Sequence, residues 1–132
     1  MSTLVDTSIW SLAFRRKTVS DPRVARLTDL INSGQVAIIG PVRQELLSGI
    51  RDPAIFSTIR RRMREFPDIP LTEDHYEQAA AFYNRCRSKG VQGSNTDFLI
   101  CAVANLHGLT IFTMDRDFET FATCLPIRLY AP

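Results

Sequence analysis

The sequence predicts an α/β fold, in which a parallel sheet is flanked by helices. Short apolar and β-branched runs alternate along the chain with longer segments whose apolar residues recur at helical spacing. The segment 98–104 is an uninterrupted run of seven apolar residues. A helix that is apolar all round is buried on every side. This segment is therefore expected at the centre of the domain, and right-handed crossovers then leave few possible topologies.

The first third of the chain predicts two strands and two helices. The run 3–5 is short and β-branched, and the helix that follows it, 9–14, begins after a cap at Thr7 or Ser8. Asp21-Pro22 opens the second helix, because Pro is favoured at the first helical position, and Gly34 ends it. The run 36–39 is entirely apolar and reads as a second buried strand.

Prolines mark the middle third. Pro41 starts a helix whose buried stripe has Glu45 on its shoulder, and Asp52-Pro53 opens another that ends by Phe66-Pro67. Pro70 restricts 69–71 to a short edge strand. The segment 72–89 is a long amphipathic helix that ends at Gly90. Its inward stripe is predicted to comprise Tyr76, Ala79, Ala80, Tyr83 and Cys86.

The central helix follows, with Asn95 as its expected N-cap and His107-Gly108 as its end. Asp97 then lies in the first turn, where the helix dipole favours a negative charge. The remaining elements are a strand at 109–113, a short helix at 118–123 and a last strand at 126–130.

Composition is that of an ordinary globular protein. The 132 residues are 45% hydrophobic and 23% charged, so we expect one domain, 1–132, with its own core. No apolar run is long enough to span a bilayer, and no secretion signal is evident, so we expect a cytoplasmic location and no membrane partner. The three cysteines lie far apart in apolar surroundings, which favours reduced core thiols over bridges or zinc ligands.

The net charge is +2, and nearly all of the basic residues are arginines. One cluster comprises Arg60, Arg61, Arg62 and Arg64. Arginine suits phosphate geometry, so this cluster is a candidate for RNA binding. The alternative is a solvated helix face, and composition alone does not identify the partner.

Four acidic residues from distant segments are expected on one rim of the sheet. Asp6 ends the first strand, and Glu45 and Asp115 follow the strands at 36–39 and 109–113. Asp97 starts a helix antiparallel to the strands, so its first turn lies at the same carboxyl edge, where sites form in open α/β sheets. Each acid has a structural alternative: helix capping for Asp6 and for Asp115 or Asp117, a charge that only matches the helix dipole for Asp97, and pairing with Arg43 or Arg51 for Glu45. Together, however, the acids repel unless a cation lies between them, and oxygen ligands suit Mg²⁺ or Mn²⁺.

Four motifs that contain these acids occur in the order and spacing of the PIN-domain family. The motifs are Val5-Asp6-Thr7-Ser8-Ile9-Trp10, then Pro41-Val42-Arg43-Gln44-Glu45-Leu46-Leu47-Ser48-Gly49, then Asp97-Phe98-Leu99-Ile100-Cys101-Ala102, and Thr113-Met114-Asp115-Arg116-Asp117-Phe118. No single motif is specific, but the four together cover nearly the whole chain. The chain thus resembles PIN domains and, among them, the VapC-type toxins of toxin–antitoxin modules. It departs from the usual pattern at Phe98, where the family often has Ala.

This resemblance implies a three-layer α/β/α fold around a five-stranded parallel sheet, and a Mg²⁺- or Mn²⁺-dependent endoribonuclease that leaves a 5′-phosphate and a 3′-hydroxyl. Asp6 and Asp97 would be the main metal ligands, Asp115 would complete the pocket, and Glu45 would position water or a second cation. Supporting roles would fall to Thr7, Thr113, Asn95 and, further out, Asp117. Implied partners are RNA, a second copy of the chain and a VapB-type antitoxin, which also forms a larger heteromer. The face of 41–66 is the candidate antitoxin groove.

Three alternative functions belong to other classes of protein. A catalytically inactive PIN-fold module that binds RNA or protein would share the fold, although the four intact acids argue against it. A phosphoacceptor receiver domain would need paired acids after the first strand and a lysine after the last core strand, and the chain supplies neither. A flap- or exonuclease-like DNA enzyme usually needs a longer chain.

Overall fold

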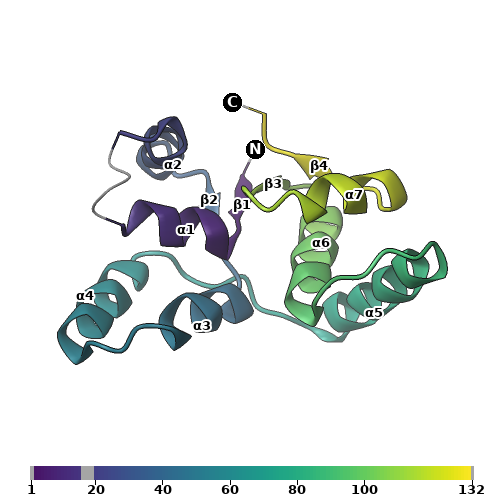
Figure 1. The fold of residues 1–132 in the computed structure, drawn as a ribbon, viewed down its shortest axis with the longest axis horizontal. Coiled ribbons are helices and arrows are strands. Elements are labelled where there is room, and N and C mark those ends of the chain that lie inside the picture. Colours follow the sequence, from purple (N-terminus) through teal and green to yellow (C-terminus); the bar gives the residue numbers. More distant parts are fainter. Residues whose placement is uncertain (1, 16–19, 132) are drawn as a thin grey trace.

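A computed structural model describes residues 2–15 and 20–131. Its sheet has four parallel strands in the order β2-β1-β3-β4 (Figure 1). The strands are β1 (Thr3–Val5), β2 (Val36–Ala37), β3 (Thr110–Phe112) and β4 (Arg128–Leu129). They form where the sequence predicts strands, although each except β1 is shorter than expected. The α/β class with a parallel sheet is therefore confirmed.

The expected fifth strand is absent from the described residues, so the five-stranded sheet is a wrong prediction. The segment after Pro67 makes only an isolated parallel bridge between Asp68 and Ile38, in which the Ile69 N–H donates to the Ile38 carbonyl at 2.9 Å. Pro67 and Pro70 flank this bridge. Proline has no N–H to donate to a ladder, so the pairing does not extend in either direction.

Seven helices occupy the described residues on the two sides of the sheet. Figure 1 shows α1–α4 on the side of β2 and α5–α7 on the side of β3 and β4. The helices are α1 (Thr7–Ala13), α2 (Pro22–Asn32), α3 (Gly40–Ser48), α4 (Pro53–Met63), α5 (Glu73–Ser88), α6 (Asn95–His107) and α7 (Asp117–Cys124). The prolines at the starts of α2, α3 and α4 lie in the first turn, as the sequence predicts.

The core is centred on α6, as expected from its apolar run. All seven residues from Phe98 to Ala104 are buried. Gly108 ends the helix with φ +66°, a left-handed conformation that glycine adopts without strain. An aromatic series then joins α6 to its neighbours: Phe98 packs against Tyr83 of α5 and Phe121 of α7, with ring centroids 5.5 and 5.1 Å away.

The inward stripe of α5 differs from the predicted one. Ala79 and Cys86 are buried as expected, but Tyr76 is 53% exposed and Ala80 is exposed. The buried face instead includes His75 and Phe82, together with Ala79 and Cys86. The buried stripe is therefore rotated away from Tyr76. Spacing alone could not choose between these faces, because apolar and aromatic residues occur on both.

The cysteines of the described chain are free thiols. Cys86 and Cys101 are buried, and Cys124 is partly buried. Among the described helices, none combines the length and apolar character needed to cross a membrane.

Candidate functional site

Asp6 lies at the carboxyl edge of the sheet, next to the end of β3. Because Val5 of β1 pairs with Phe112 of β3, the residues that follow them, Asp6 and Thr113, are neighbours. The Asp6 Oδ2 atom accepts hydrogen bonds from Thr113 Oγ1 and from Ser8 Oγ, both at 2.8 Å. The residue is only 7% exposed. A buried carboxylate with two hydroxyl donors is a fixed acceptor rather than a mobile surface charge.

Asp6 does not cap α1. It occupies the N-cap position, but its side chain makes no capping hydrogen bond to that helix, all of whose residues are described. Its carboxylate therefore does not have the helix-capping role that the sequence allowed. It contacts Thr113, the residue after β3, instead.

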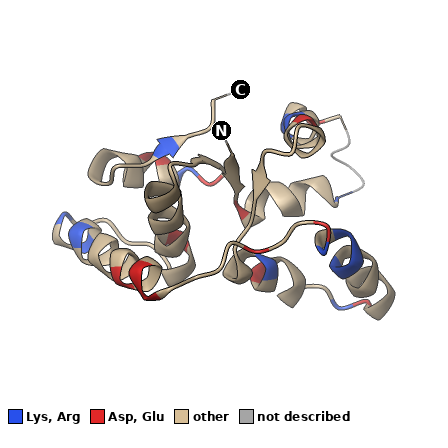
Figure 2. Cartoon of the chain, turned by 180° about the vertical axis from the view of Figure 1, so that it is seen from behind, with Lys and Arg blue, Asp and Glu red and all other residues tan. Residues whose placement is uncertain are grey.

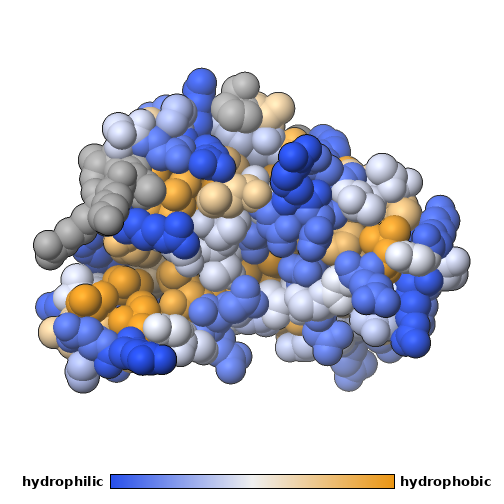
Figure 3. Space-filling view, viewed as in Figure 1, coloured by the Kyte–Doolittle hydropathy of each residue, from blue (hydrophilic) through white to orange (hydrophobic). Residues whose placement is uncertain are grey.

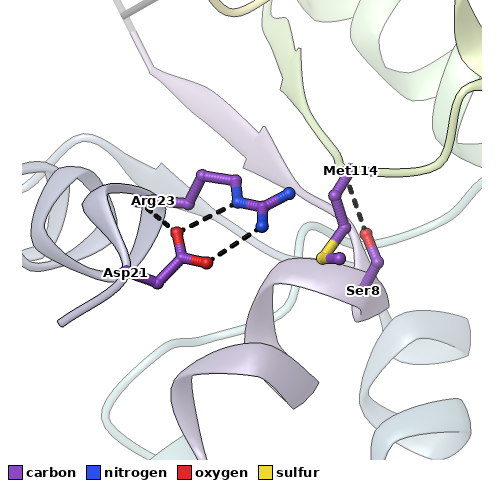
Figure 4. A network of polar contacts seen from close by, with 4 residues as sticks. All are labelled: Ser8, Asp21, Arg23 and Met114. Carbon is purple, nitrogen blue, oxygen red and sulfur yellow. Dashed lines mark hydrogen bonds and ion pairs between the residues drawn. The ribbon is translucent and has the colours of Figure 1, made fainter. Parts of the chain in front are cut away.

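Ser8 is a site residue that the sequence analysis treated only as a cap. Its hydroxyl contacts Asp6 and also accepts a hydrogen bond from the Met114 N–H at 3.2 Å, which ties α1 to the loop after β3 (Figure 4). The Asp-x-Ser spacing was the available signal, since a serine two residues after an aspartate readily makes a local hydrogen bond to it.

Asp97 lies in the first turn of α6, but Asn95 is not the N-cap, contrary to prediction. Ser94 has that position: its Oγ accepts from the Asp97 N–H at 3.1 Å, while its own N–H donates to Asp97 Oδ2 at 3.0 Å. This reciprocal capping box satisfies two backbone donors at once, which explains why the helix starts one residue earlier than expected. Asn95 is exposed as the first helical residue.

The pKa of Asp97 is raised above its ordinary value, chiefly by burial. The two hydrogen bonds with Ser94 oppose this shift, and the negative charges of Asp6 and Asp115 add to it. Cys101, one turn further along α6, is also affected: burial raises its thiol pKa, with further contributions from Asp97 and Asp6. Asp6, Asp97 and Asp115 therefore share one electrostatic neighbourhood, as the sequence predicts.

Asp115 is the exposed member of this neighbourhood. Its N–H donates to Thr113 Oγ1 at 2.9 Å, so one hydroxyl links the backbone of Asp115 to the carboxylate of Asp6. Asp115 Oδ1 accepts from the Asp117 N–H at 2.9 Å, a local turn at the start of α7. Asp117 is itself exposed and makes this contact through its backbone.

Glu45 is exposed on α3, and its charge is not among those that shift the pKa of Asp97. The expected alternative, a pair with a nearby arginine, is not formed with the described residues either: Arg43 pairs with Asp68 at 2.9 Å and donates to the carbonyls of Met63 and Phe66.

The donor set suits a hard cation, although the carboxylates do not form a closed cage. Within residues 2–15 and 20–131, no three side chains of the His, Cys, Asp and Glu types are placed to hold one ion together. Mg²⁺ commonly binds through one or two carboxylates and keeps several waters, which matches Asp6 and Asp97. Thr7 Oγ1, expected to support the acids, is instead buried without a hydrogen-bond partner in the described chain.

A basic side chain lies at the edge of this region. Arg23, near the start of α2, is held by Asp21 through its Nε at 3.1 Å and one terminal nitrogen at 2.9 Å. Figure 4 shows the guanidinium extended toward Met114, the residue that contacts Ser8. Hydrogen bonding with Asp21 raises the pKa of Arg23 further, so the group remains a cation.

The α4 arginines form a separate surface. Arg60, Arg61, Arg62 and Arg64 are all exposed, and Arg60 lies over the Phe56 ring at 5.8 Å from its centroid. Together with Ser57, three of them line a shallow hollow: Arg60, Arg61 and Arg64. This surface lies on α4, away from the strands of the sheet (Figure 2).

Comparison with known proteins assigns the fold and the family. The PIN domain family model matches residues 3–123. Ribonuclease VapC11 of Mycobacterium tuberculosis is 31% identical over 122 residues, which cover 90% of each chain.

Two solved structures share the fold. FitAcB from Neisseria gonorrhoeae has a TM-score of 0.80 at 22% identity and covers 98% of this chain and 97% of its own. A toxin–antitoxin complex from Klebsiella pneumoniae has a TM-score of 0.64 at 24% identity and covers 89% and 90%. Because the family model and the VapC relative both extend over most of its length, the chain belongs to the PIN-domain family and, within it, to the VapC group.

Proposed function

We propose that this chain is the toxin of a toxin–antitoxin module and that it hydrolyses RNA as a Mg²⁺- or Mn²⁺-dependent endoribonuclease. The observation that carries the proposal is the shared neighbourhood of Asp6, Asp97 and Asp115, three acids from distant segments. Like charges in one place cost stability, and a divalent cation removes that cost. The identity with a ribonuclease of the VapC group supports RNA as the substrate.

Asp6 and Asp97 are the residues we propose to hold the ion, with Asp115 at the exposed side. A bound Mg²⁺ or Mn²⁺ would neutralise charge on the scissile phosphate and favour ionisation of water. Thr113 and Ser8 fix the Asp6 carboxylate, and Ser94 fixes Asp97. Glu45 remains the candidate to position water or a second cation when RNA is bound.

The test is cleavage of RNA by the purified protein with and without divalent ions. Asp6→Asn and Asp97→Asn are expected to lower the rate by roughly 100-fold or more, since each removes charge at the position of the developing negative charge. Asp29→Asn is the matched control. This acid is exposed near the end of α2, and the chain from there enters β2 at the edge of the sheet opposite to the one with the acids. Full activity in both site variants would refute the proposal. RNA binding without cleavage by the wild type would favour the inactive binding module.

An antitoxin is the proposed regulatory partner, and the face of 41–66 is its proposed docking surface. Its apolar part includes Ile55, which is 51% exposed on α4, and Figure 3 shows an orange area over that helix. The arginines of α4 lie on the same helix. The similarity to a solved toxin–antitoxin complex supports such a partner. Ile55→Glu is expected to weaken co-purification with the antitoxin while RNA cleavage persists.

A homodimer, and a larger heteromer with antitoxin, complete the proposal. Light scattering of the purified chain, alone and with its antitoxin, measures both. A monomer at micromolar concentration would remove the dimer from the proposal without affecting the catalytic part.

A further inference from the structure

The two histidines of the chain meet at one end of the α5–α6 pair, away from the acids. His75, in the first turn of α5, is 6% exposed, and His107, at the end of α6, is exposed. Their Nε2 atoms are 2.8 Å apart, their ring planes differ by 4° and their centroids are 5.1 Å apart. Rings stacked face to face cannot bring these nitrogens so close. With the two Nε2 atoms this close, the ring centroids cannot lie farther apart than they do. Each ring therefore points its Nε2 atom directly at the other ring, and the two rings lie in one plane.

This geometry holds a single proton between the rings. A metal ion does not fit, because each nitrogen would be far closer to it than the usual 2.0–2.1 Å or so of a metal–imidazole bond. Two N–H groups facing each other would repel, and two bare nitrogens would make no hydrogen bond. One ring therefore donates and the other accepts.

The surroundings of His75 decide which ring donates. The Thr72 N–H donates to His75 Nδ1 at 2.9 Å, so Nδ1 carries the lone pair and the ring proton lies on Nε2. His75 Nε2–H then donates to His107 Nε2, and His107 has its own proton on Nδ1. The same contacts complete the capping box of α5, because Thr72 is its N-cap.

We propose that His75 and His107 form an acid-sensitive latch that fastens the first turn of α5 to the last turn of α6. An added proton on His107 Nε2 faces the His75 N–H and breaks the bond between the rings. An added proton on His75 Nδ1 displaces the hydrogen bond from the Thr72 N–H, but Thr72 Oγ1, 3.0 Å from Nδ1, can accept it, and the bond between the rings remains. The closed latch therefore holds at most one added proton, because a second would set two N–H groups face to face between the rings, whereas two separated histidines can each bind one. Acid favours the open form by this difference in bound protons.

The other charged groups near the latch are two carboxyl groups and a guanidinium group. Glu73 and Asp74 lie beside His75 in the first turn of α5, and Arg128 of β4 donates to the Gly108 carbonyl at 3.2 Å. Ordinary carboxyl and guanidinium groups do not change charge between about pH 5.5 and 7.5, where an ordinary histidine does. A change of stability in this range that requires the histidines thus reports the latch.

Nuclear magnetic resonance of the ring nitrogens tests the tautomers directly, since the chain has only two histidines. At about pH 7.5 we expect His75 as the Nε2–H form and His107 as the Nδ1–H form. His75 with its proton on Nδ1, or either ring doubly protonated at that pH, would overturn the proposal.

Thermal unfolding tests the consequence. On acidification from about pH 7.5 to about pH 5.5, we expect the wild-type Tm to fall by roughly 3–6 °C more than that of the double variant His75→Gln/His107→Gln, which has no histidine to titrate. Effects of Asp97 are present in both proteins and cancel. His107→Gln alone, whose amide oxygen can still accept from His75, serves if the double variant does not fold, and its fall is expected to be smaller than that of the wild type. Equal falls in the wild type and the variant would refute the latch.

Discussion

Asp97 lies where folding disfavours its charge. Its pKa is raised by burial, with the charges of Asp6 and Asp115 adding to the shift, and the hydrogen bonds from Ser94 offset only part of it. A carboxyl with a raised folded-state pKa gives stability that is complete at low pH and is lost as the pH rises through that pKa. At neutral pH without divalent ions, the ionised Asp97 therefore destabilises the fold.

Asp97→Asn is accordingly expected to stabilise the metal-free protein while it abolishes activity. At about pH 7 with EDTA, the variant should melt roughly 2–4 °C above the wild type, because Asn removes the charge and its amide oxygen still accepts from Ser94. The difference in Tm should narrow as the pH falls, because the raised pKa of Asp97 lets it take up a proton at a higher pH than an ordinary aspartate. Asp29→Asn, exposed on α2, is the control, and a variant less stable than wild type in EDTA would contradict the argument.

Added Mg²⁺ or Mn²⁺ should reverse the order of the melting temperatures, so that the wild type melts above Asp97→Asn. An ion that binds only the folded state raises its Tm in proportion to the logarithm of its concentration over Kd. We expect a rise for the wild type and none for Asp97→Asn in a melting series from about 0.1 to 10 mM. Equal rises in both proteins would place the ion elsewhere.

Arg23 is expected to contribute to RNA binding, if the proposed function holds. Asp21 fixes its guanidinium, which extends toward Met114, the residue whose N–H donates to Ser8 (Figure 4). A pre-ordered arginine suits a backbone phosphate next to the one that is cut. Arg23→Ala should raise KM by about 3- to 10-fold with a smaller change in kcat. Arg26→Ala, exposed on the same helix, should change neither, and equal effects of the two variants would assign Arg23 a merely local role.

At the scale of elements, the start of α6 depends on a close contact at Gly93. A Cβ atom there would lie 2.6 Å from Phe121 Cζ and 3.1 Å from Phe98 Cε2, both on rigid, packed rings. Gly93→Ala should therefore destabilise the protein by about 1–3 kcal/mol and displace Asp97. Gly49→Ala is the matched control, because a Cβ at that position meets nothing within 4 Å and its φ is −95°. Urea unfolding measures both, and equal stabilities would contradict the prediction.

The sequence predicts the ends of helices well where the backbone conformation of a single residue sets the boundary. Pro22 and Pro53 start helices and Gly108 ends one, because ring closure or a left-handed φ fixes the boundary locally. Prediction fails where tertiary contacts decide. Ser94 rather than Asn95 caps α6 because Asp97 reaches back to it, and Tyr76 is exposed because His75 is held by His107.

The candidate site follows the same division. Parallel strands and an antiparallel helix place Asp6, Asp97 and Asp115 at one rim whatever their side-chain contacts, and the pattern of acids was enough to predict this. The Ser8 and Thr113 hydroxyls that hold Asp6 depend on the register of β1 with β3, which the sequence does not specify. Glu45 lies on a helix, so its distance from the rim depends on the direction of α3, which the sequence does not specify.

At the scale of the molecule, the acids and the arginine-bearing turn of α4 are separate surfaces (Figure 2). If a long RNA contacted both surfaces, the α4 arginines would neutralise some of its phosphates while one of its phosphodiester linkages lay at the acids. Replacement of Arg60, Arg61 and Arg62 by Gln should then lower the slope of log affinity against log salt concentration by about two units, because each lost single-strand contact removes about 0.7. Replacement by Gln of Arg87, exposed on α5, and of Lys89, the exposed C-cap of that helix, should leave the slope unaltered. An unchanged slope in the triple variant, combined with weaker antitoxin binding, would assign the α4 surface to the antitoxin, since a protein partner can use arginines that the RNA does not contact.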